Sequence, residues 1–211
     1  MLPKNQHYQN TAKTIINNLE KRQMKGWYCE DRAAAIKKVL ELVPNHASVT
    51  WGGTMTMEEC GLMDALKEEN YTLIDYFSAK TPQEKKELYA KAVCADYFFM
   101  STNAITLDGE LVNVDGAGNR VACLCNGPDH VIILAGMHKV AVTLEEAHDR
   151  VRNTAAPINA LRLNKKTPCS VTGRCSQCQS PDCICSQVVV TRRSHIPGRI
   201  QVILIGEELG Y

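Results

Sequence analysis

The sequence predicts an α/β fold in which a parallel sheet is covered by helices. Strand-like apolar segments alternate with segments of helical periodicity between residues 46 and 100, which is typical of strands joined by crossover helices. Two uniformly apolar runs, Tyr97–Met100 and Val131–Ala135, suit strands that are buried on both faces. Gly, Asn, Asp and Thr are concentrated between these runs beyond what packing requires, so we expect this stretch to face a ligand.

The N-terminal residues 1–45 are expected to form two helices. Apolar residues recur at helical spacing through residues 5–25, with Lys, Asn and Gln on the opposite side. Gly26 interrupts this pattern, and the acidic start at Asp31 suits the dipole of a second helix that ends near Leu42. The first helix is expected to pack on the body of the protein or on a second subunit. A homodimer is therefore one of the two expected arrangements.

The predicted core, residues 46–166, opens with a strand, a glycine turn and a helix. The strand covers residues 46–51 and leads directly into Gly52, Gly53 and Thr54, after which a helical pattern begins. The free N–H groups of a first helical turn can bind an anion at such a place. A simple tight turn between a strand and a helix explains the same residues equally well.

The rest of the core continues the alternation. Ligands bind beyond the carboxyl ends of parallel strands, so Gly52–Thr54 and Ser101–Ala104 should share one rim of the sheet. Residues 115–120 are predicted to be flexible and polar, and residues 187–211 hold two strands that return to the core. The further predicted elements are a buried strand over 71–77, a capped helix over 81–95, a hairpin turn at Asp108-Gly109, a capped helix over 143–154 and a helix from Pro157.

Composition excludes several classes of partner. The formal net charge of +1 and the few aromatic residues, 6% of the chain, argue against nucleic acid and against an anionic membrane surface. No apolar run approaches the roughly 20 residues of a membrane span, and the N-terminus lacks the apolar stretch of a signal peptide. We therefore expect a cytoplasmic protein whose ten cysteines serve as thiolates or metal ligands.

Polar groups beside the two buried runs predict a pocket for a small organic acid. Arg120 suits a bidentate contact with a carboxylate, and Lys139 supplies a point charge. Alternatively, the Asn, Asp and Gly residues only build turns and both cations face solvent. The density of polar groups favours a site, although spacing alone singles out no catalytic residue. The predicted substrate-binding residues are Gly52, Gly53, Thr54, Thr102, Asn103, Asn113, Asp115, Gly116, Asn119, Arg120 and Lys139.

A cysteine-rich segment, residues 167–186, predicts a metal site. Five cysteines with the spacing C-x5-C-x2-C-x4-C-x-C, Cys169, Cys175, Cys178, Cys183 and Cys185, lie among mostly polar, Gly and Pro residues. Metal ligation would supply the folding energy that this segment cannot obtain from an apolar core. Four thiolates suffice for zinc or for an iron–sulfur cluster, and the spacing does not choose between them. Free thiols, or a redox disulfide between Cys175 and Cys178, are the alternative.

Several motifs together resemble the LUD (lactate utilization) domain family. They are Gly52-Gly53-Thr54, STNAITLDGELVNVDGAGNRVA, NGPDHVIILAG, TPCSVTGRCSQC and the closing VILIGEELGY, and they span nearly the whole chain. The resemblance implies a Rossmann-like parallel sheet with an antiparallel excursion, as in glucosamine-phosphate deaminase, ribose-phosphate isomerase and CoA transferases. The terminal cysteine array departs from the smaller lactate-utilization subunit and marks a stand-alone branch. Cys169, Cys175, Cys178 and Cys185 fit the pattern of that branch, and Cys183 is extra.

The resemblance implies a part in the oxidation of L-lactate to pyruvate within a multi-protein system that includes an iron–sulfur subunit. We therefore expect binding of a small carboxylate, lactate or another 2-hydroxy acid, with an iron–sulfur cluster passing its electrons to a redox partner protein. One alternative is a non-catalytic ligand-binding subunit with structural zinc, which has no redox chemistry. Another is an isomerase or acyl-transfer enzyme of the wider superfamily, for which Asp115 and Glu110 are the candidate carboxylates. Whether the chain is an enzyme stays open; as an enzyme it would be an oxidoreductase.

Overall fold

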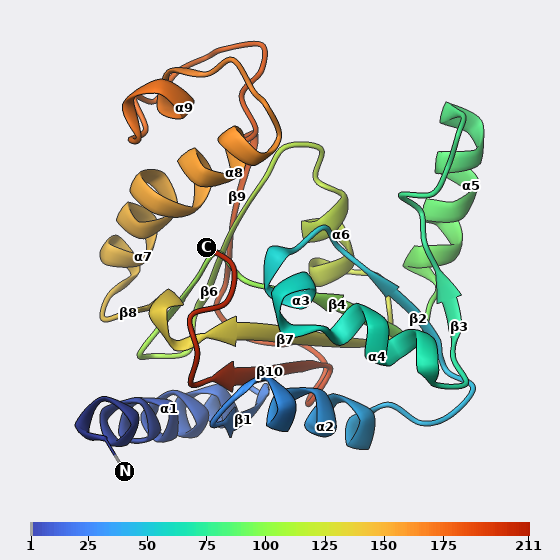
Figure 1. Ribbon diagram of the computed structural model, residues 1–211, viewed down its shortest axis with the longest axis vertical. Coiled ribbons are helices and arrows are strands. Elements are labelled where there is room, and N and C mark those ends of the chain that lie inside the picture. Colours follow the sequence, from blue (N-terminus) through green and yellow to red (C-terminus); the bar gives the residue numbers. More distant parts are fainter. Residues whose placement is uncertain (1) are drawn as a thin grey trace.

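The computed structural model, which describes residues 2–211, is built on a six-stranded sheet (Figure 1). The strands lie in the order β1, β10, β7, β4, β2, β3, and every neighbouring pair is parallel. The predicted α/β fold with a parallel sheet is therefore confirmed. The strands are β1 (Lys25–Cys29), β2 (Ser48–Trp51), β3 (Thr72–Ile74), β4 (Tyr97–Met100), β7 (His130–Gly136) and β10 (Ile200–Ile205).

Helices connect these strands and cover both faces of the sheet. Thr81 and Thr143 cap two of the helices as predicted, because each side chain accepts a hydrogen bond from the backbone N–H three residues on. The helices are α1 (Pro3–Lys21), α2 (Arg32–Leu42), α3 (Met55–Cys60), α4 (Leu62–Glu68), α5 (Pro82–Val93), α6 (Asn119–Cys125), η1 (Met137–Lys139), α7 (Leu144–Arg150), η2 (Val151–Ala155), α8 (Ala156–Arg162) and α9 (Pro168–Thr172).

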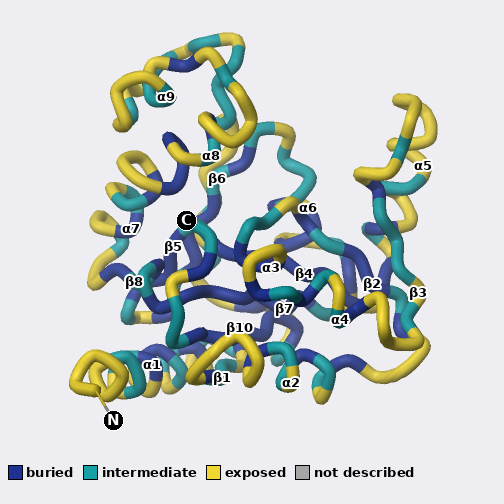
Figure 2. The backbone as a smooth tube through the Cα atoms, in the orientation of Figure 1, coloured by how far each residue is buried: buried dark blue, intermediate teal, exposed yellow. Residues whose placement is uncertain are grey.

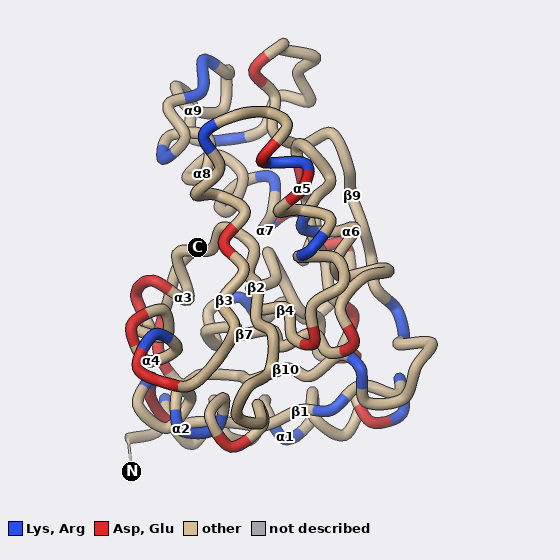
Figure 3. Tube along the Cα trace, turned by 90° about the vertical axis from the view of Figure 1, so that its right-hand side faces the viewer, with Lys and Arg blue, Asp and Glu red and all other residues tan. Residues whose placement is uncertain are grey.

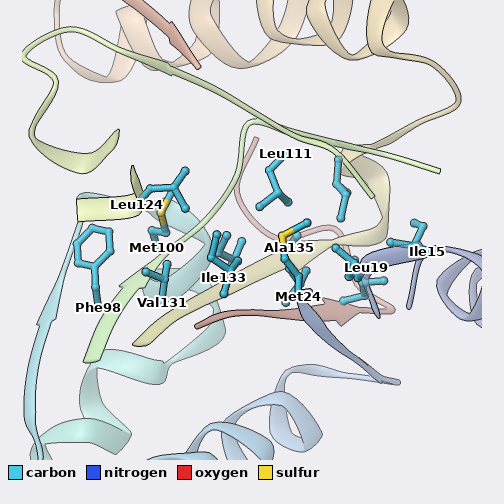
Figure 4. Close-up of a cluster of buried hydrophobic side chains, with 14 of the residues drawn as sticks. Ile15, Leu19, Met24, Phe98, Met100, Leu111, Leu124, Val131, Ile133 and Ala135 are labelled. Atoms are coloured by element: carbon cyan, nitrogen blue, oxygen red, sulfur yellow. The ribbon is translucent and has the colours of Figure 1, made fainter. Parts of the chain in front are cut away.

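The runs Tyr97–Met100 in β4 and Val131–Ala135 in β7 are apolar because each of the two faces of these strands enters a separate core. Val131, Ile133 and Ala135 of β7 pack in one cluster with Leu19 of α1 and Leu124 of α6 (Figure 4). The alternate side chains of β7 enter a second cluster with residues of α2, α3 and α4. A strand with water on neither face has no position for a polar side chain, which explains the continuous apolar runs.

A second, four-stranded sheet lies beside the first and forms the antiparallel excursion. Its order is β8, β5, β6, β9, and the β5–β6 pair is the hairpin predicted at Asp108-Gly109. Together with α7, α8, α9 and the cysteine segment, it makes a lobe in the upper part of Figure 1. Figure 2 shows that α9 and the cysteine segment are mostly exposed or half-buried. The strands are β5 (Ala104–Thr106), β6 (Leu111–Asp115), β8 (Val140–Ala141) and β9 (Gln187–Thr191).

The structure differs from the sequence-based prediction in four elements. Residues 25–29 form strand β1, although only two helices were expected in residues 1–45, because pairing with β10 at the edge of the sheet gives this segment a partner that no local pattern reveals. Asn119 begins helix α6, although residues 115–120 were expected to be flexible. Strand β3 is an edge strand and only partly buried. A π-helical turn, η2, joins α7 to α8 without the predicted break before Pro157.

Among the residues that the structure describes, no helix combines the length and the apolar character needed to cross a lipid bilayer.

Candidate functional site

A cavity of about 710 Å³ lies at the carboxyl-end rim of the parallel sheet, between the sheet and the lobe. Its walls come from the segments that follow β2 and β4, from the start of α6 and from α5 and α8. The structure thus brings Gly53–Thr54 and Ser101–Asn103 to one rim, as the order of the strands predicted. Of the predicted substrate-binding residues, nine line this cavity: Gly53, Thr54, Thr102, Asn103, Asp115, Gly116, Asn119, Arg120 and Lys139.

The guanidinium group of Arg120 is held by the cavity wall itself. Its Nη1 donates to the carbonyl oxygen of Ser101 at 3.1 Å and to Asn113 Oδ1 at 2.6 Å. Its Nη2 donates to Asn103 Oδ1 at 3.1 Å and to the carbonyl oxygen of Val114 at 2.8 Å. These four bonds use all four terminal N–H groups. Arg120 therefore fixes the wall. Its remaining donor, Nε–H, lies 3.7 Å from Oδ2 of Asp115, so the bidentate contact with a carboxylate expected from the sequence would have to replace some of these four bonds.

Gly52 and Asn113, the two predicted residues that do not line the cavity, both support Arg120. A Cβ atom at Gly52 would lie 3.0 Å from Cγ of Arg120, so glycine leaves the space that the arginine occupies. Asn113 is fully buried, and its Oδ1 accepts the shortest of the four hydrogen bonds from Arg120. These two residues therefore shape the site from behind its surface.

The candidate carboxylates for isomerase or acyl-transfer chemistry both have structural partners. Asp115 Oδ1 accepts from the backbone N–H of Gly118 at 2.8 Å, and its Oδ2 lies 3.7 Å from Nε of Arg120. Glu110 is not among the residues that line the cavity and pairs with Arg22 at 3.6 Å. The arrangement of Asp115 stabilises the start of α6, because a carboxylate accepts the free N–H groups there.

Lys139, in η1, is a buried cation with no carboxylate partner among the described residues. Its side chain is 2% exposed, and Nζ donates to Thr56 Oγ1 at 2.8 Å and to Ser101 Oγ at 3.0 Å. Burial, together with the positive charge of Arg150, lowers the pKa of the Lys139 amine to about 7. A lysine with this pKa exchanges a proton with a ligand far more readily than an exposed lysine does.

The pKa of Lys139 predicts how stability depends on pH. The amine binds a proton less readily in the folded protein than in the unfolded chain, where its pKa is near 10.5. The unfolded state therefore holds more protons between about pH 7 and pH 10.5, and the free energy of unfolding should rise across this window. The rise attributable to Lys139 is at most about 5 kcal/mol, at about 1.4 kcal/mol per pKa unit.

Urea unfolding of the wild-type protein and of the Lys139→Met variant at several pH values measures this effect. The difference in unfolding free energy between the two proteins isolates Lys139 from the other groups that titrate in the same window. A difference that stays constant from pH 7 to pH 10 would show that the amine has an ordinary pKa.

The outer part of the cavity is also rich in cations. Lys85 from α5 and Arg162 and Lys165 from the end of α8 line it, and Lys and Arg positions are visible on α5 and near α8 in Figure 3. With Arg120 and Lys139, five cations line the cavity against two carboxylates, Asp115 and Asp182. The cavity therefore favours an anionic ligand.

Sequence reasoning missed several of the lining residues. Thr56 accepts a hydrogen bond from Lys139, and the hydroxyl of Tyr211 donates to Asn159 Oδ1 at 3.1 Å. Polar residues in helices are ordinarily solvated, so nothing local marks Lys85, Asn159 or Arg162 as ligand-facing.

All five cysteines of the terminal segment line a second cavity of about 320 Å³. Each of them is half-buried. Burial raises the pKa of the Cys185 thiol to about 12, and the neighbouring Cys183, Cys175 and Cys169 raise it further in the same direction. Cysteines that lie far apart in this polar segment are thus gathered at one place.

Two backbone hydrogen bonds fix Cys175, the first cysteine of the C-x2-C pair. The backbone N–H of Gln177 donates to Cys175 Sγ at 3.3 Å, and the N–H of Cys175 donates to the carbonyl oxygen of Arg152 in η2 at 3.1 Å. Hydrogen bonds to sulfur stabilise thiolates that bind metal. In residues 2–211, no three Cys, His, Asp or Glu side chains lie close enough together to share one metal ion. Cys169, Cys175, Cys178 and Cys185 line the same cavity, but their side chains would have to approach one another to bind a cluster.

The two cavities share a wall. Val114, Cys183 and Ile184 line both of them, so the thiol cavity and the cationic cavity adjoin at these residues. Cys183 is the cysteine that faces both, whereas the other four line the thiol cavity only. This position separates Cys183 from the four proposed ligands.

A parallel sheet with a polar cavity beyond the carboxyl ends of its strands defines a Rossmann-type α/β protein. The sequence profile of the LUD domain matches residues 12–205. The chain therefore belongs to the LUD domain family, as its motifs indicated. None of the curated proteins compared with it matches.

A solved structure with a TM-score above 0.5 supports the fold, and two others are similar over a smaller part of the chain. A DUF162 family protein from Deinococcus radiodurans is similar over 94% of this chain and 98% of its own, with a TM-score of 0.58 and 13% sequence identity. Ribose 5-phosphate isomerase A from Methanocaldococcus jannaschii (TM-score 0.34, 16% identity) matches over 55% of this chain and 56% of its own. The delta subunit of eIF2B from Chaetomium thermophilum (TM-score 0.36, 17% identity) matches over 61% and 52%.

Proposed function

We propose that this protein binds a small carboxylate, lactate or another 2-hydroxy acid, in the cationic cavity and contributes to its oxidation with an iron–sulfur cluster. The observation that carries the proposal is the wall of Val114, Cys183 and Ile184 shared by the two cavities. A cluster bound by the four cysteines would lie next to the bound acid, separated from it by little more than one layer of residues.

The chemistry assigns a part to each cavity. Conversion of a 2-hydroxy acid to a 2-oxo acid releases two electrons and two protons. An iron–sulfur cluster transfers electrons one at a time, so a redox partner protein would accept them in turn. Lys85, Arg162 and Lys165 hold the carboxylate, and the Lys139 amine, with its lowered pKa, is suited in its neutral form to take a proton.

Binding of the acid can be tested separately from redox activity. Changing Arg162 and Lys165 together to Met removes two of the five cavity cations, and we expect the affinity for lactate and for pyruvate to fall at least tenfold, about 1.4 kcal/mol. Isothermal titration of the full chain measures this. Lys67→Met is the matched control, since Lys67 is exposed, pairs with Asp64 and lies outside the cavity. Equal affinities in the double variant and the wild type would contradict binding of the acid in this cavity.

A further inference from the structure

The setting of Lys139 leaves one position of its amine for a ligand. The Thr56 hydroxyl donates to the carbonyl oxygen of Leu209 at 3.1 Å, and the Ser101 hydroxyl donates to the carbonyl oxygen of Thr102 at 3.3 Å. Since each hydroxyl has a single hydrogen, both oxygens accept from Lys139. The amine therefore uses two N–H groups on the protein, and its third position opens onto the cavity that Lys139 lines.

The charges around Lys139 favour its neutral form, in which this third position carries a lone pair. The positive charges of Arg150 in α7 and Arg120 in α6 disfavour a positive charge on the amine. The negative charge of Glu59 in α3 favours it, but this effect is smaller than that of Arg150. His138, the preceding residue, is also kept neutral near pH 7, because burial lowers its pKa to about 4. A desolvated lysine next to another cation is an activated nucleophile.

Space is kept free around the amine. A Cβ atom at Gly210 would lie 3.2 Å from Nζ of Lys139 and 2.6 Å from Thr56 Oγ1, and Gly210 has a φ of +66°. A side chain at residue 210 would therefore crowd the amine as well as strain the backbone.

We propose that Lys139 is a nucleophilic lysine whose amine condenses with the carbonyl group of a 2-oxo acid bound in the cavity. The nitrogen attacks the carbonyl carbon, a carbon–nitrogen bond forms, and the carbonyl oxygen leaves as water with the two hydrogens of the neutral amine. The product is an imine, and no oxidant or reductant is needed. This inference rests on the proposed function, because a 2-oxo acid is the product of that oxidation.

Reductive trapping tests the inference without the cluster. The full chain is incubated with pyruvate, treated with borohydride, which reduces an imine to a stable secondary amine, and digested for peptide mass mapping. We expect the adduct on Lys139, formed at least tenfold more than on the exposed Lys67. Lys139→Met should lose the adduct, while Lys67→Met should keep it. Mapping on the wild-type chain identifies the modified residue even if the Lys139→Met variant folds poorly.

Titration of the same sample with pyruvate distinguishes a failure of the inference about Lys139 from a failure of the proposed function. Binding of pyruvate without an adduct on Lys139, or with an adduct spread evenly over exposed lysines, overturns the inference and leaves the proposed function standing. Absence of both binding and adduct overturns the proposed function and this inference with it.

Discussion

Changing Cys175 and Cys178 together to Ser is expected to remove all bound iron and sulfide from the anaerobically purified protein. The two thiols line the cavity of the cysteine segment, and the N–H of Gln177 already donates to Cys175 Sγ. A cluster that loses two of four thiolate ligands has no remaining protein ligands to replace them except Cys183. Quantitation of iron, zinc and sulfide, with the visible absorption spectrum of the same sample, measures the effect.

The matched control is the pair Cys94→Ser and Cys125→Ser. Both thiols are exposed and lie outside the segment, so this double variant should keep its full metal content. Loss of metal from both double variants would indicate general misfolding rather than loss of ligands. Stoichiometric zinc in a colourless wild-type protein would contradict the iron–sulfur cluster and would make the segment structural.

Changing Arg120 to Met should destabilise the fold more than any other substitution in the cavity wall. Four acceptors lose their donor at once, in Ser101, Asn103, Asn113 and Val114. Removing one partner from a buried charged network costs roughly 3–5 kcal/mol. For a chain of this size that corresponds to a fall of about 6–20 °C in melting temperature. Urea unfolding followed by circular dichroism measures the change.

Arg162→Met gives the comparison within the same cavity. Arg162 is exposed, and its hydrogen bonds go to the neighbouring Asn159, so the variant should change stability by no more than about 0.5 kcal/mol. If Arg120→Met lowered the free energy of unfolding as little as Arg162→Met does, the guanidinium would not be holding the wall. A direct contact with ligand would then be the role left for Arg120.

The local sequence pattern was sufficient for the parts of the fold that depend on neighbouring residues. The apolar runs that became β4 and β7, the caps at Thr81 and Thr143 and the hairpin at Asp108-Gly109 all appear as predicted. Each of these rests on side-chain periodicity or on a hydrogen bond spanning a few residues, so the information lies within one short segment.

The candidate site depended on contacts between distant segments. Nine of the eleven substrate-binding residues predicted from the sequence line the cavity. The role of each residue in the site could not be predicted in the same way. Arg120 was expected to bind ligand, and the acceptors that hold it come from two other segments of the chain, residues 101–103 and residues 113–114.

The sequence therefore indicated the fold class, the family and the two places where chemistry is concentrated, because composition, caps and motifs are properties of the chain itself. Only the tertiary structure decided that β1 joins the sheet, that Lys139 is buried without a carboxylate partner in residues 2–211, and that Cys183 lines both cavities. Strand pairing, desolvation and a shared wall each arise when segments far apart in sequence meet, so no local pattern encodes them.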